Sequence, residues 1–540
     1  MSQLRSRRGL RRATAALAAA LLLASAWPAL AGDAPAGPEV HVATGTLEGL
    51  REDAHGVGLR VFRGIPYAAA PTGRLRWRAP QPAAAWQGVR KAQRFGPRCM
   101  QRGLFGDMVF RSDGMSEDCL YLNVWTPAQA SGAKLPVLVY FYGGGFVGGD
   151  GSEPRYDGAG LAAKGIVTVT VNYRLDVFGF LALPALADES PHHAAGNYGL
   201  LDQAAALRWV HDNIAAFGGD PGAITIGGES AGSMSVSALM ASPLSRGLLR
   251  RAIGESGAVL GNLAPPSLAA AEKQGEAFAK HVGAHSLAQL RAMPAATLLE
   301  ACGDKGVAEF GPDVDGWFLP RPPEAIYQAG EQAHVPLLVG SNSQEGYYAY
   351  LLQDAAPTPD AYRAVVRKQF GAHADEALRL YPGATGAEVK ASGTALSGDM
   401  FIAFSTWRWM DLQRRTGDAP VYYYYFTQPR PASRDGRQPA GTGAVHSGEI
   451  EYALGNLAGN RVYAWTDEDR AVSATLQDYF AAFIKTGDPN AAGLPHWPAA
   501  APADGGLWRQ EIGPHTHTFV DRNAPRYGFL QRALPPEAQP

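Results

Sequence analysis

Ser230 is the residue of this sequence whose surroundings point most directly to chemistry. It lies in the stretch AITIGGESAGSMS (residues 223–235), with Gly228 two positions before it and Gly232 two positions after it. Glycines at these positions allow a sharp turn from a strand into a helix, which lifts the serine hydroxyl clear of the sheet. The turn also leaves the N–H of Ala231 at a helix N-terminus, where it can bind developing negative charge. The stretch therefore predicts a nucleophile, although ordinary turns also contain glycine and serine.

A serine hydroxyl is a weak nucleophile unless a base, a group that orients the base, and hydrogen-bond donors for the oxyanion lie beside it. The stretch FYGGGFVGGD (residues 141–150) contains three adjacent glycines after the strongest predicted strand. Such glycines can expose N–H groups to a substrate oxygen, so we expect Gly144 and Gly145 to form an oxyanion hole with Ala231. The spacing matches neither the dinucleotide-binding fingerprint nor the P-loop, which argues against a phosphate loop.

The elements that must position these groups follow an alternating pattern. Short and continuously apolar runs, typical of strands that are covered on both faces, occur at residues 135–142, 166–173, 223–226, 335–340 and 421–426. Residues 200–217 carry apolar side chains three or four positions apart, which predicts a helix that ends at the glycines of 218–222. The order strand, helix, strand, Ser230, helix predicts an α/β fold with a large, mostly parallel central sheet flanked by helices.

Composition and charge exclude several function classes. The formal net charge is −2 and no long basic run follows the first residues, so we expect no nucleic-acid partner and a neutral or weakly charged ligand.

No linker or repeat divides the chain, which predicts one domain over residues 32–540. Helical patterns at 263–334 and 357–418 predict excursions over the active site.

Residues 1–31 have the pattern of a signal peptide. A basic start and an apolar middle are followed by the small-x-small ending Ala29-Leu30-Ala31, which predicts export and cleavage after Ala31. The apolar part is short and ends at Trp27-Pro28, which argues against a membrane span, so we expect no membrane contact after cleavage. The pair Arg7-Arg8 leaves both the general and the twin-arginine export routes open. The mature protein is therefore expected in a periplasm or outside the cell.

The cysteines and histidines do not indicate a metal or cofactor. Cys99 and Cys119 are close enough in sequence to close a loop in an exported protein, which leaves Cys302 over. No Cys-x-x-Cys or Cys/His spacing indicates structural zinc. His515 and His517 could share one face of a strand, but two ligands do not make a metal site.

Further stretches of the chain resemble the type-B carboxylesterases, a family that includes bacterial para-nitrobenzyl esterases and the cholinesterases. Besides the serine turn and the glycine loop, they are SEDCLYLNVWTP (116–127), GNYGLLDQAAALRWVHDNIAAFGGDP (196–221), VGSNSQEG (339–346), GAVHSGEIEYALGN (443–456) and KTGDPN with HWP (485–498). The resemblance runs in one order from about Val40 to Trp497. It implies the α/β-hydrolase fold and the hydrolysis of small-molecule carboxylic esters.

The resemblance implies a catalytic triad and an acyl-enzyme intermediate. Ser230 matches the family nucleophile, Glu345 matches the acid and His446 matches the base. The chain order serine, acid, histidine is the order expected for this kind of serine turn. Glu345 follows a predicted strand and His446 lies in a glycine-rich loop, which are positions where catalytic groups usually occur.

The same resemblance assigns roles to residues beside the triad. Glu229 matches an acid that faces the family's pocket, although exposure to solvent or a local hydrogen bond is the alternative. Ser256 resembles a serine near the triad acid, and a plain turn serine is the alternative. Cys99 and Cys119 match the ends of the family's first disulfide loop.

That loop also bears on the substrate. Cholinesterases place in it a tryptophan that holds a quaternary ammonium group, whereas residues 99–119 contain no tryptophan here. Phe105 and Phe110 are weaker cation-binding faces, so we expect poor turnover of choline esters. An amide, a carbamate or a bulky ester remains an alternative target of the same triad. A non-catalytic binding protein is a second alternative. The presence of suitable residues at all three triad positions argues against it. The natural substrate and the oligomeric state are left open.

Overall fold

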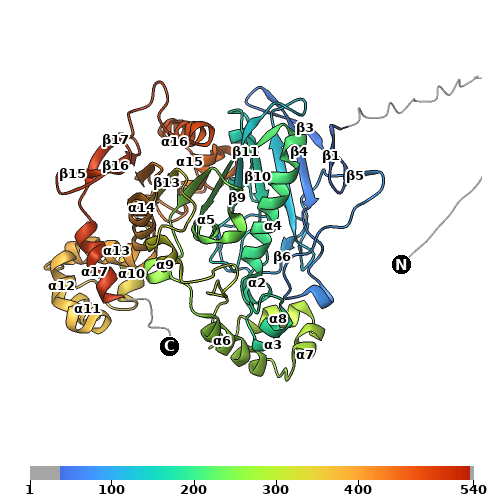
Figure 1. Cartoon of the computed structure of the whole chain (residues 1–540). Coiled ribbons are helices and arrows are strands. Elements are labelled where there is room, and N and C mark those ends of the chain that lie inside the picture. Colours follow the sequence, from blue (N-terminus) through green and yellow to red (C-terminus); the bar gives the residue numbers. More distant parts are fainter. Residues whose placement is uncertain (1–36, 535–540) are drawn as a thin grey trace, which may run out of the picture. The chain divides into compact units, whose positions relative to one another are not determined.

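A computed structural model describes residues 37–534 of the chain, so the expected signal peptide at 1–31 lies outside the described residues. The described part contains a sheet of 12 strands with helices on both faces (Figure 1). This agrees with the α/β fold that the sequence pattern predicts and with the α/β-hydrolase architecture that the resemblance implies. None of the helices within 37–534 has both the length and the apolar character needed to traverse a lipid bilayer.

The sheet is parallel in its middle and antiparallel at its ends. Its strands follow the order β15, β16, β14, β13, β12, β11, β9, β10, β8, β4, β3, with β17 paired to β16. All neighbours from β10 to β16 through β9, β11, β12, β13 and β14 are parallel. The bounds are β3 Leu50–Ala54, β4 Val57–Pro66, β8 Tyr121–Thr126, β9 Leu135–Phe141, β10 Val167–Val171, β11 Gly219–Glu229, β12 Arg251–Glu255, β13 Leu337–Asn342, β14 Val421–Phe426, β15 Pro502–Ala503, β16 Gly506–Ile512 and β17 His517–Asp521.

The predicted strands and helix are confirmed. Each of the five apolar runs overlaps a strand of the parallel middle, namely β9, β10, β11, β13 and β14. The predicted helix at 200–217 is α4 (Tyr198–Asn213) continued by a 3-10 turn at Ile214–Phe217. Gly218, with a φ of 86°, ends this segment, and β11 begins at once at Gly219 rather than after Gly222.

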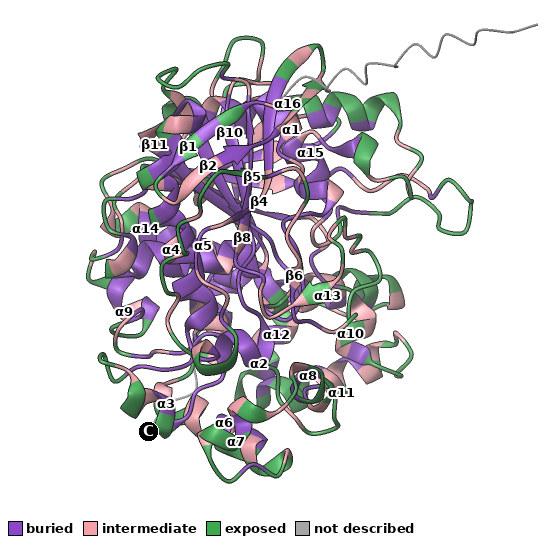
Figure 2. Cartoon of the chain, turned by 90° about the vertical axis from the view of Figure 1, so that its right-hand side faces the viewer, coloured by how far each residue is buried: buried purple, intermediate pink, exposed green. Residues whose placement is uncertain are grey.

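Helices cover both faces of the sheet and bury it. The helices α4, α5 (Ala231–Ala241) and α14 (Phe404–Thr416) lie on one face, and α1 (Ala159–Ala162), α15 (Ile450–Leu454) and α16 (Asp467–Thr486) lie on the other, so the strands between them are buried (Figure 2). This double cover explains the continuous hydrophobicity of the central strands.

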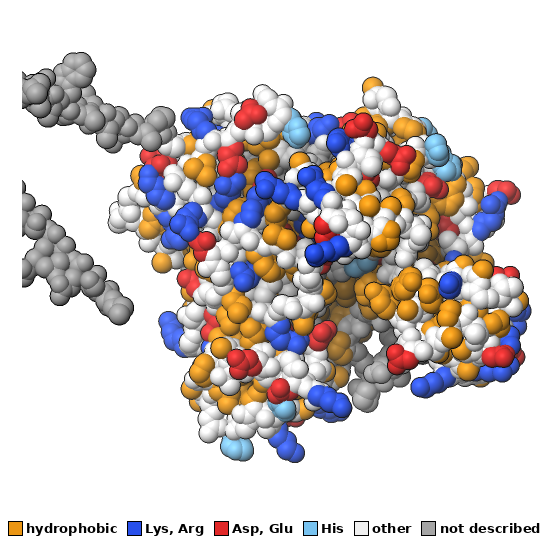
Figure 3. All heavy atoms as spheres, turned by 180° about the vertical axis from the view of Figure 1, so that it is seen from behind, with side chains coloured by type: hydrophobic (Ala, Val, Ile, Leu, Met, Phe, Trp, Pro, Cys, Tyr) orange, Lys and Arg blue, Asp and Glu red, His pale blue; other side chains and the backbone are white. Residues whose placement is uncertain are grey.

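The two predicted excursions are helical. The first contains α6 (Leu268–His281), α7 (Leu287–Ala292), α8 (Ala295–Ala301) and α9 (Pro323–Gln328). The second contains α11 (Pro359–Phe370), α12 (Ala374–Leu380), α13 (Gly386–Gly398), a π-helical turn at Asp399–Ala403, and α14. Most of the second excursion packs with α10 (Tyr348–Leu352) and α17 (Ala524–Ala533) around a hydrophobic core of its own. The surface is hollowed between this part and the rest of the molecule, and hydrophobic side chains gather beside the hollow (Figure 3).

Candidate active site

Ser230 occupies a tight turn between β11 and α5. Its φ is 56°, in the left-handed region that residues with a Cβ rarely adopt. The flanking glycines are needed because the backbone is crowded: a Cβ on Gly228 would lie 2.5 Å from the carbonyl carbon of Gly232, and one on Gly232 would lie 2.0 Å from the carbonyl oxygen of Phe141. The turn therefore has the strained geometry that the sequence predicts for a nucleophilic serine.

Two other loops bring an imidazole and a carboxylate to this serine. His446 lies between β14 and α15, and its Nε2 is 3.0 Å from Oγ of Ser230. Glu345 lies three residues beyond β13, and its Oε2 is 2.8 Å from Nδ1 of His446. An ionised carboxylate only accepts hydrogen bonds, so Nδ1 carries the hydrogen and Nε2 is left to accept the serine proton.

Buried hydrogen bonds fix the position of Glu345. Its Oε1 accepts from Oγ of Ser256 at 2.5 Å and from the backbone N–H of Asn342 at 2.7 Å. Ser256 is fully buried and follows β12, with a φ of 55°. The structure thus brings Ser256 to Glu345, rather than leaving it in an unrelated turn. Such a bond orients the carboxylate and thereby the imidazole.

Glu229 is buried beside the imidazole and is not exposed to solvent. Only 2% of the residue is exposed, and its Oε1 lies 3.3 Å from Nε2 of His446. Burial is the main reason why the pKa of Glu229 is raised to about 7. The positive charge of His446 acts in the opposite direction and lowers this pKa. A second carboxylate therefore faces the same imidazole nitrogen as the serine hydroxyl.

The charge around His446 favours the imidazolium. Burial by itself would lower the pKa of His446, but the nearby Glu229 and Glu345 outweigh that effect, and the pKa is raised to about 9. An imidazolium that forms when the histidine accepts a proton is thus stabilised on both sides of the ring.

The glycine loop lies directly against the serine turn. A Cβ on Gly143 would lie 3.0 Å from Cβ of Ser230 and 2.6 Å from Oε2 of Glu229. Gly144 and Gly145 follow with φ values of 115° and 62°, which favour glycine. Ala231 is the first residue of α5, so its N–H has no partner within the helix. The three residues expected to form an oxyanion hole therefore belong to two segments that meet at Ser230.

Two residues beside Ser230, His446 and Glu345 were not predicted from the sequence. The ring of Phe401 lies edge-on to the imidazole of His446, with the ring centres 4.9 Å apart. Phe401 is 47% exposed. It belongs to the π-helical turn, which has no clear sequence signature. Glu449 is fully buried, accepts a hydrogen bond from the Asn342 side chain and lies 3.5 Å from Oγ of Ser256. The sequence signal that could have pointed to Glu449 was the presence of an acidic residue three positions after His446.

A disulfide joins Cys99 to Cys119, the pair that the resemblance implies. Its loop borders the glycine loop: Cβ atoms added to Gly144 and Gly148 would lie 2.9 Å from Met108 and 3.5 Å from Phe105. Phe110 lies under the guanidinium of Arg98.

The remaining cysteine and histidine candidates lie outside this site. Cys302 is a buried free cysteine. Nδ1 of His517 is 2.8 Å from the backbone oxygen of His515, so that ring turns to its own chain. Within 37–534, no three His, Cys, Asp or Glu side chains gather in a way that could hold a metal ion.

Comparison with known proteins gives matches over nearly the whole described part. The profile of the carboxylesterase family matches residues 36–524. The fumonisin B1 esterase of Sphingopyxis macrogoltabida is 37% identical over 85% of this chain and 84% of its own length. The para-nitrobenzyl esterase of Bacillus subtilis is 35% identical over 84% and 91%, and the liver carboxylesterase of Sus scrofa is 35% identical over 94% and 95%. Ser230, Glu345 and His446 all lie within the matched residues.

Proposed function

The chain belongs to the carboxylesterase family, and from this premise we propose that Ser230, His446 and Glu345 form its catalytic triad. Members of the family are carboxylic ester hydrolases, so the chain is a serine esterase for small-molecule esters. The observation that carries the triad is the position of the His446 ring, which is 3.0 Å from Oγ of Ser230 at one nitrogen and 2.8 Å from Glu345 at the other.

In the first half of the reaction the enzyme is acylated. His446 takes the proton of Ser230, and Oγ attacks the ester carbonyl to give a tetrahedral intermediate. The N–H groups of Gly144, Gly145 and Ala231 donate to its oxyanion. The imidazolium then gives the proton to the departing alcohol as the C–O bond breaks, which leaves an acyl-enzyme on Ser230.

In the second half a water molecule releases the acid. His446 removes a proton from the water, whose oxygen attacks the acyl carbon, and the same donors bind the second oxyanion. Collapse of that intermediate returns the proton to Oγ of Ser230 and frees the carboxylic acid. Glu345 holds the ring in one tautomer throughout, and Ser256 positions Glu345 through the hydrogen bond to Oε1.

The proposed substrates are simple aryl and alkyl esters. Two of the relatives are named para-nitrobenzyl esterase and fumonisin B1 esterase, so members of the family are named for different esters. Phe105 borders the glycine loop, and residues 99–119 contain no tryptophan, which supports an uncharged alcohol part over a quaternary ammonium.

We also propose that the enzyme is exported to a periplasm or to the outside of the cell. The basic and apolar pattern of residues 1–31 supports export, and so does the disulfide, because such bonds persist in oxidising compartments.

The triad is tested by kinetics on two variants and two matched controls. Ser230→Ala and His446→Ala are each expected to reduce kcat for para-nitrophenyl butyrate by several orders of magnitude, and Ser230→Ala is expected to keep the unfolding curve of the parent. Ser131→Ala, at an exposed serine, and His211→Ala, at a partly exposed histidine, are expected to hydrolyse the ester like the parent. Parent-like turnover by Ser230→Ala would refute the assignment.

A further inference from the structure

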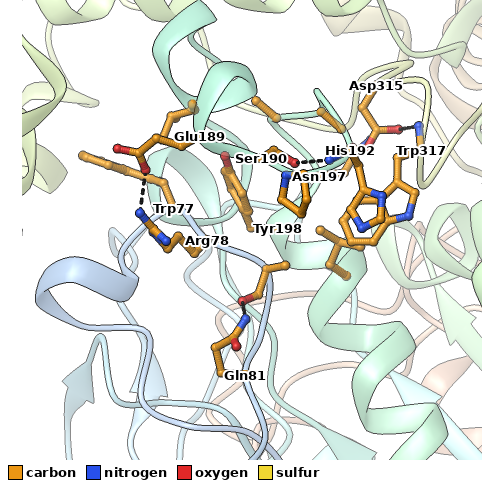
Figure 4. A pocket seen from close by; sticks show the side chains of 16 residues that line it. Trp77, Arg78, Gln81, Glu189, Ser190, His192, Asn197, Tyr198, Asp315 and Trp317 are labelled. Atoms are coloured by element: carbon orange, nitrogen blue, oxygen red, sulfur yellow. Dashed lines mark hydrogen bonds and ion pairs between the residues drawn. The ribbon is translucent and has the colours of Figure 1, made fainter.

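A cavity away from the triad lies between three segments that are distant in sequence. Its volume is 240 Å³, and its lining comes from residues 77–81, 186–201 and 315–317 (Figure 4). None of the residues that we assign to catalysis lines it. Nothing in the proposed ester hydrolysis requires this cavity.

Aromatic and aliphatic side chains form most of its wall. Trp77 and Tyr198 face it together with Leu186 and Leu201. On another side the imidazole of His192 lies flat on the indole of Trp317, with the ring centres 3.8 Å apart and the planes 10° from parallel. Flat aromatic walls favour a ligand that contains a ring.

Trp77 is held in an unfavourable conformation at this wall. Its φ is 56°, in the left-handed region, where a bulky side chain is rare. The residue is 1% exposed, and its Nε1 donates to the carbonyl oxygen of Val177 at 2.8 Å. Strained residues that the surrounding structure fixes in this way occur preferentially at ligand sites.

The charged groups of the lining already have partners. Arg78 lies 3.0 Å from Glu189, which also pairs with Arg291 at 2.9 Å. One carboxylate oxygen of Asp315 accepts from the backbone N–H groups of Trp317 and Leu319. A charged ligand would have to break the Arg78–Glu189 pair or compete with the backbone donors of Asp315, so the cavity favours an uncharged one.

A small number of polar groups remain to orient such a ligand. Tyr198 is 4% exposed, and its hydroxyl points to the side of the cavity where Ser190 and Glu189 lie (Figure 4). The Ser190 hydroxyl accepts from the N–H of His192 at 3.2 Å and keeps its own hydrogen to donate. These groups can exchange one or two hydrogen bonds with a ligand hydroxyl, which is fewer than a sugar ring would need.

We propose that this cavity is a second ligand site, which binds an uncharged phenol with a single aromatic ring. An apolar cavity of about 150 Å³ holds benzene, so 240 Å³ has room for a substituted ring with a hydroxyl group. The ring packs between Trp77 and the His192–Trp317 pair, and its hydroxyl bonds to Tyr198.

Titration of the full chain with 4-fluorophenol and 4-fluorotoluene, followed by fluorine NMR, tests this site. Ala79→Trp places a large side chain at a half-buried lining position and is expected to remove saturable binding of both compounds. Tyr198→Phe is expected to weaken 4-fluorophenol about fivefold, because one hydrogen bond is lost, and to leave 4-fluorotoluene unchanged. Hydrolysis of para-nitrophenyl butyrate is expected to stay within about twofold of the parent in both variants, which shows that they fold.

Tyr350→Phe, at an exposed tyrosine outside this cavity, is the matched control and is expected to bind both compounds like the parent. The proposal is overturned if Ala79→Trp binds 4-fluorophenol as tightly as the parent does, or if the parent shows no saturable binding. It is also overturned if Tyr198→Phe weakens both compounds equally, since the hydroxyl would then have no role in recognition. These outcomes do not depend on which residues catalyse ester hydrolysis.

Discussion

Oε1 of Glu229 lies 3.3 Å from Nε2 of His446, the same nitrogen that lies 3.0 Å from the hydroxyl of Ser230. The proposed base therefore has carboxylates near both of its nitrogens, since Glu345 bonds to Nδ1. Two buried carboxylates beside one imidazole stabilise its protonated form, which helps the ring to take the serine proton. The same charge also holds a proton on the free enzyme at a pH where an ordinary histidine is neutral.

Replacement of Glu229 by Gln is expected to shift the acid limb of the pH–rate profile to lower pH. The neutral form of His446 is the active base, and the carboxylate of Glu229 contributes to raising the His446 pKa to about 9. Removal of that charge lowers this pKa, so the neutral ring persists to lower pH. The measurement is kcat/KM against pH for a para-nitrophenyl ester. Glu300→Gln, at an exposed acid, serves as the control, and an acid limb that stays in place or moves upward in Glu229→Gln argues against the coupling.

Addition of one methyl group at Gly143 is expected to impair catalysis with little effect on the rest of the fold. A Cβ there would meet Oε2 of Glu229 at 2.6 Å and Cβ of Ser230 at 3.0 Å, so the glycine loop must move away from the serine turn. Displaced oxyanion donors reduce kcat by roughly 100-fold. Gly103→Ala is the control, because nothing lies within 4 Å of the added atom. Equal kcat values for the two variants contradict the proposed contact.

Removal of the disulfide is expected to destabilise the protein by about 3 kcal/mol, as chain-entropy estimates give for a loop of this length. The double variant Cys99→Ser/Cys119→Ser opens a loop whose ends are 20 residues apart in sequence. Denaturant unfolding under non-reducing conditions measures the difference. Cys302→Ala keeps the disulfide and isolates the effect of the free thiol. An unreduced digest in which the parent shows free thiols at both positions means that the bond does not form.

Butyrylcholine is expected to be hydrolysed at least about tenfold less efficiently than phenyl butyrate, measured as kcat/KM. The disulfide loop offers no tryptophan, and the face of Phe110 is already occupied by the guanidinium of Arg98. Phe105 alone is a weak partner for a quaternary ammonium. The two esters share their acyl group, so the comparison isolates the alcohol part, and equal or faster turnover of the choline ester overturns this prediction.

The sequence predicted the strands that are buried on both faces. The runs at 135–142 and 421–426 are apolar throughout because helices cover both of their faces, which produces a signal that needs no knowledge of the partners. The antiparallel strand β3 was missed, since its sequence LREDA carries three charged side chains in succession at the edge of the sheet. Strand β12, with five residues, is likewise too short and too polar to be recognised from the sequence.

Within the proposed site, a local pattern marks Ser230, whereas contacts that arise only in three dimensions leave no such pattern in the sequence. Ser230 has flanking glycines because its backbone is crowded, and this crowding is visible as a motif. The sequence assigned Glu229 to a pocket or to solvent, but its distance from His446 depends on how β11 and the loop after β14 meet. Phe401 depends on a π-helical turn whose residues resemble those of an ordinary helix.

The central claim is tested most directly by the site at which a serine-reactive organophosphate attaches. Digestion and mass spectrometry after treatment with diethyl para-nitrophenyl phosphate are expected to locate one diethylphosphoryl group, on Ser230, together with loss of ester hydrolysis. The reaction is expected to slow by several orders of magnitude in His446→Ala, because the hydroxyl then has no base. Attachment to a different residue, or labelling of His446→Ala at the parent rate, would contradict the account.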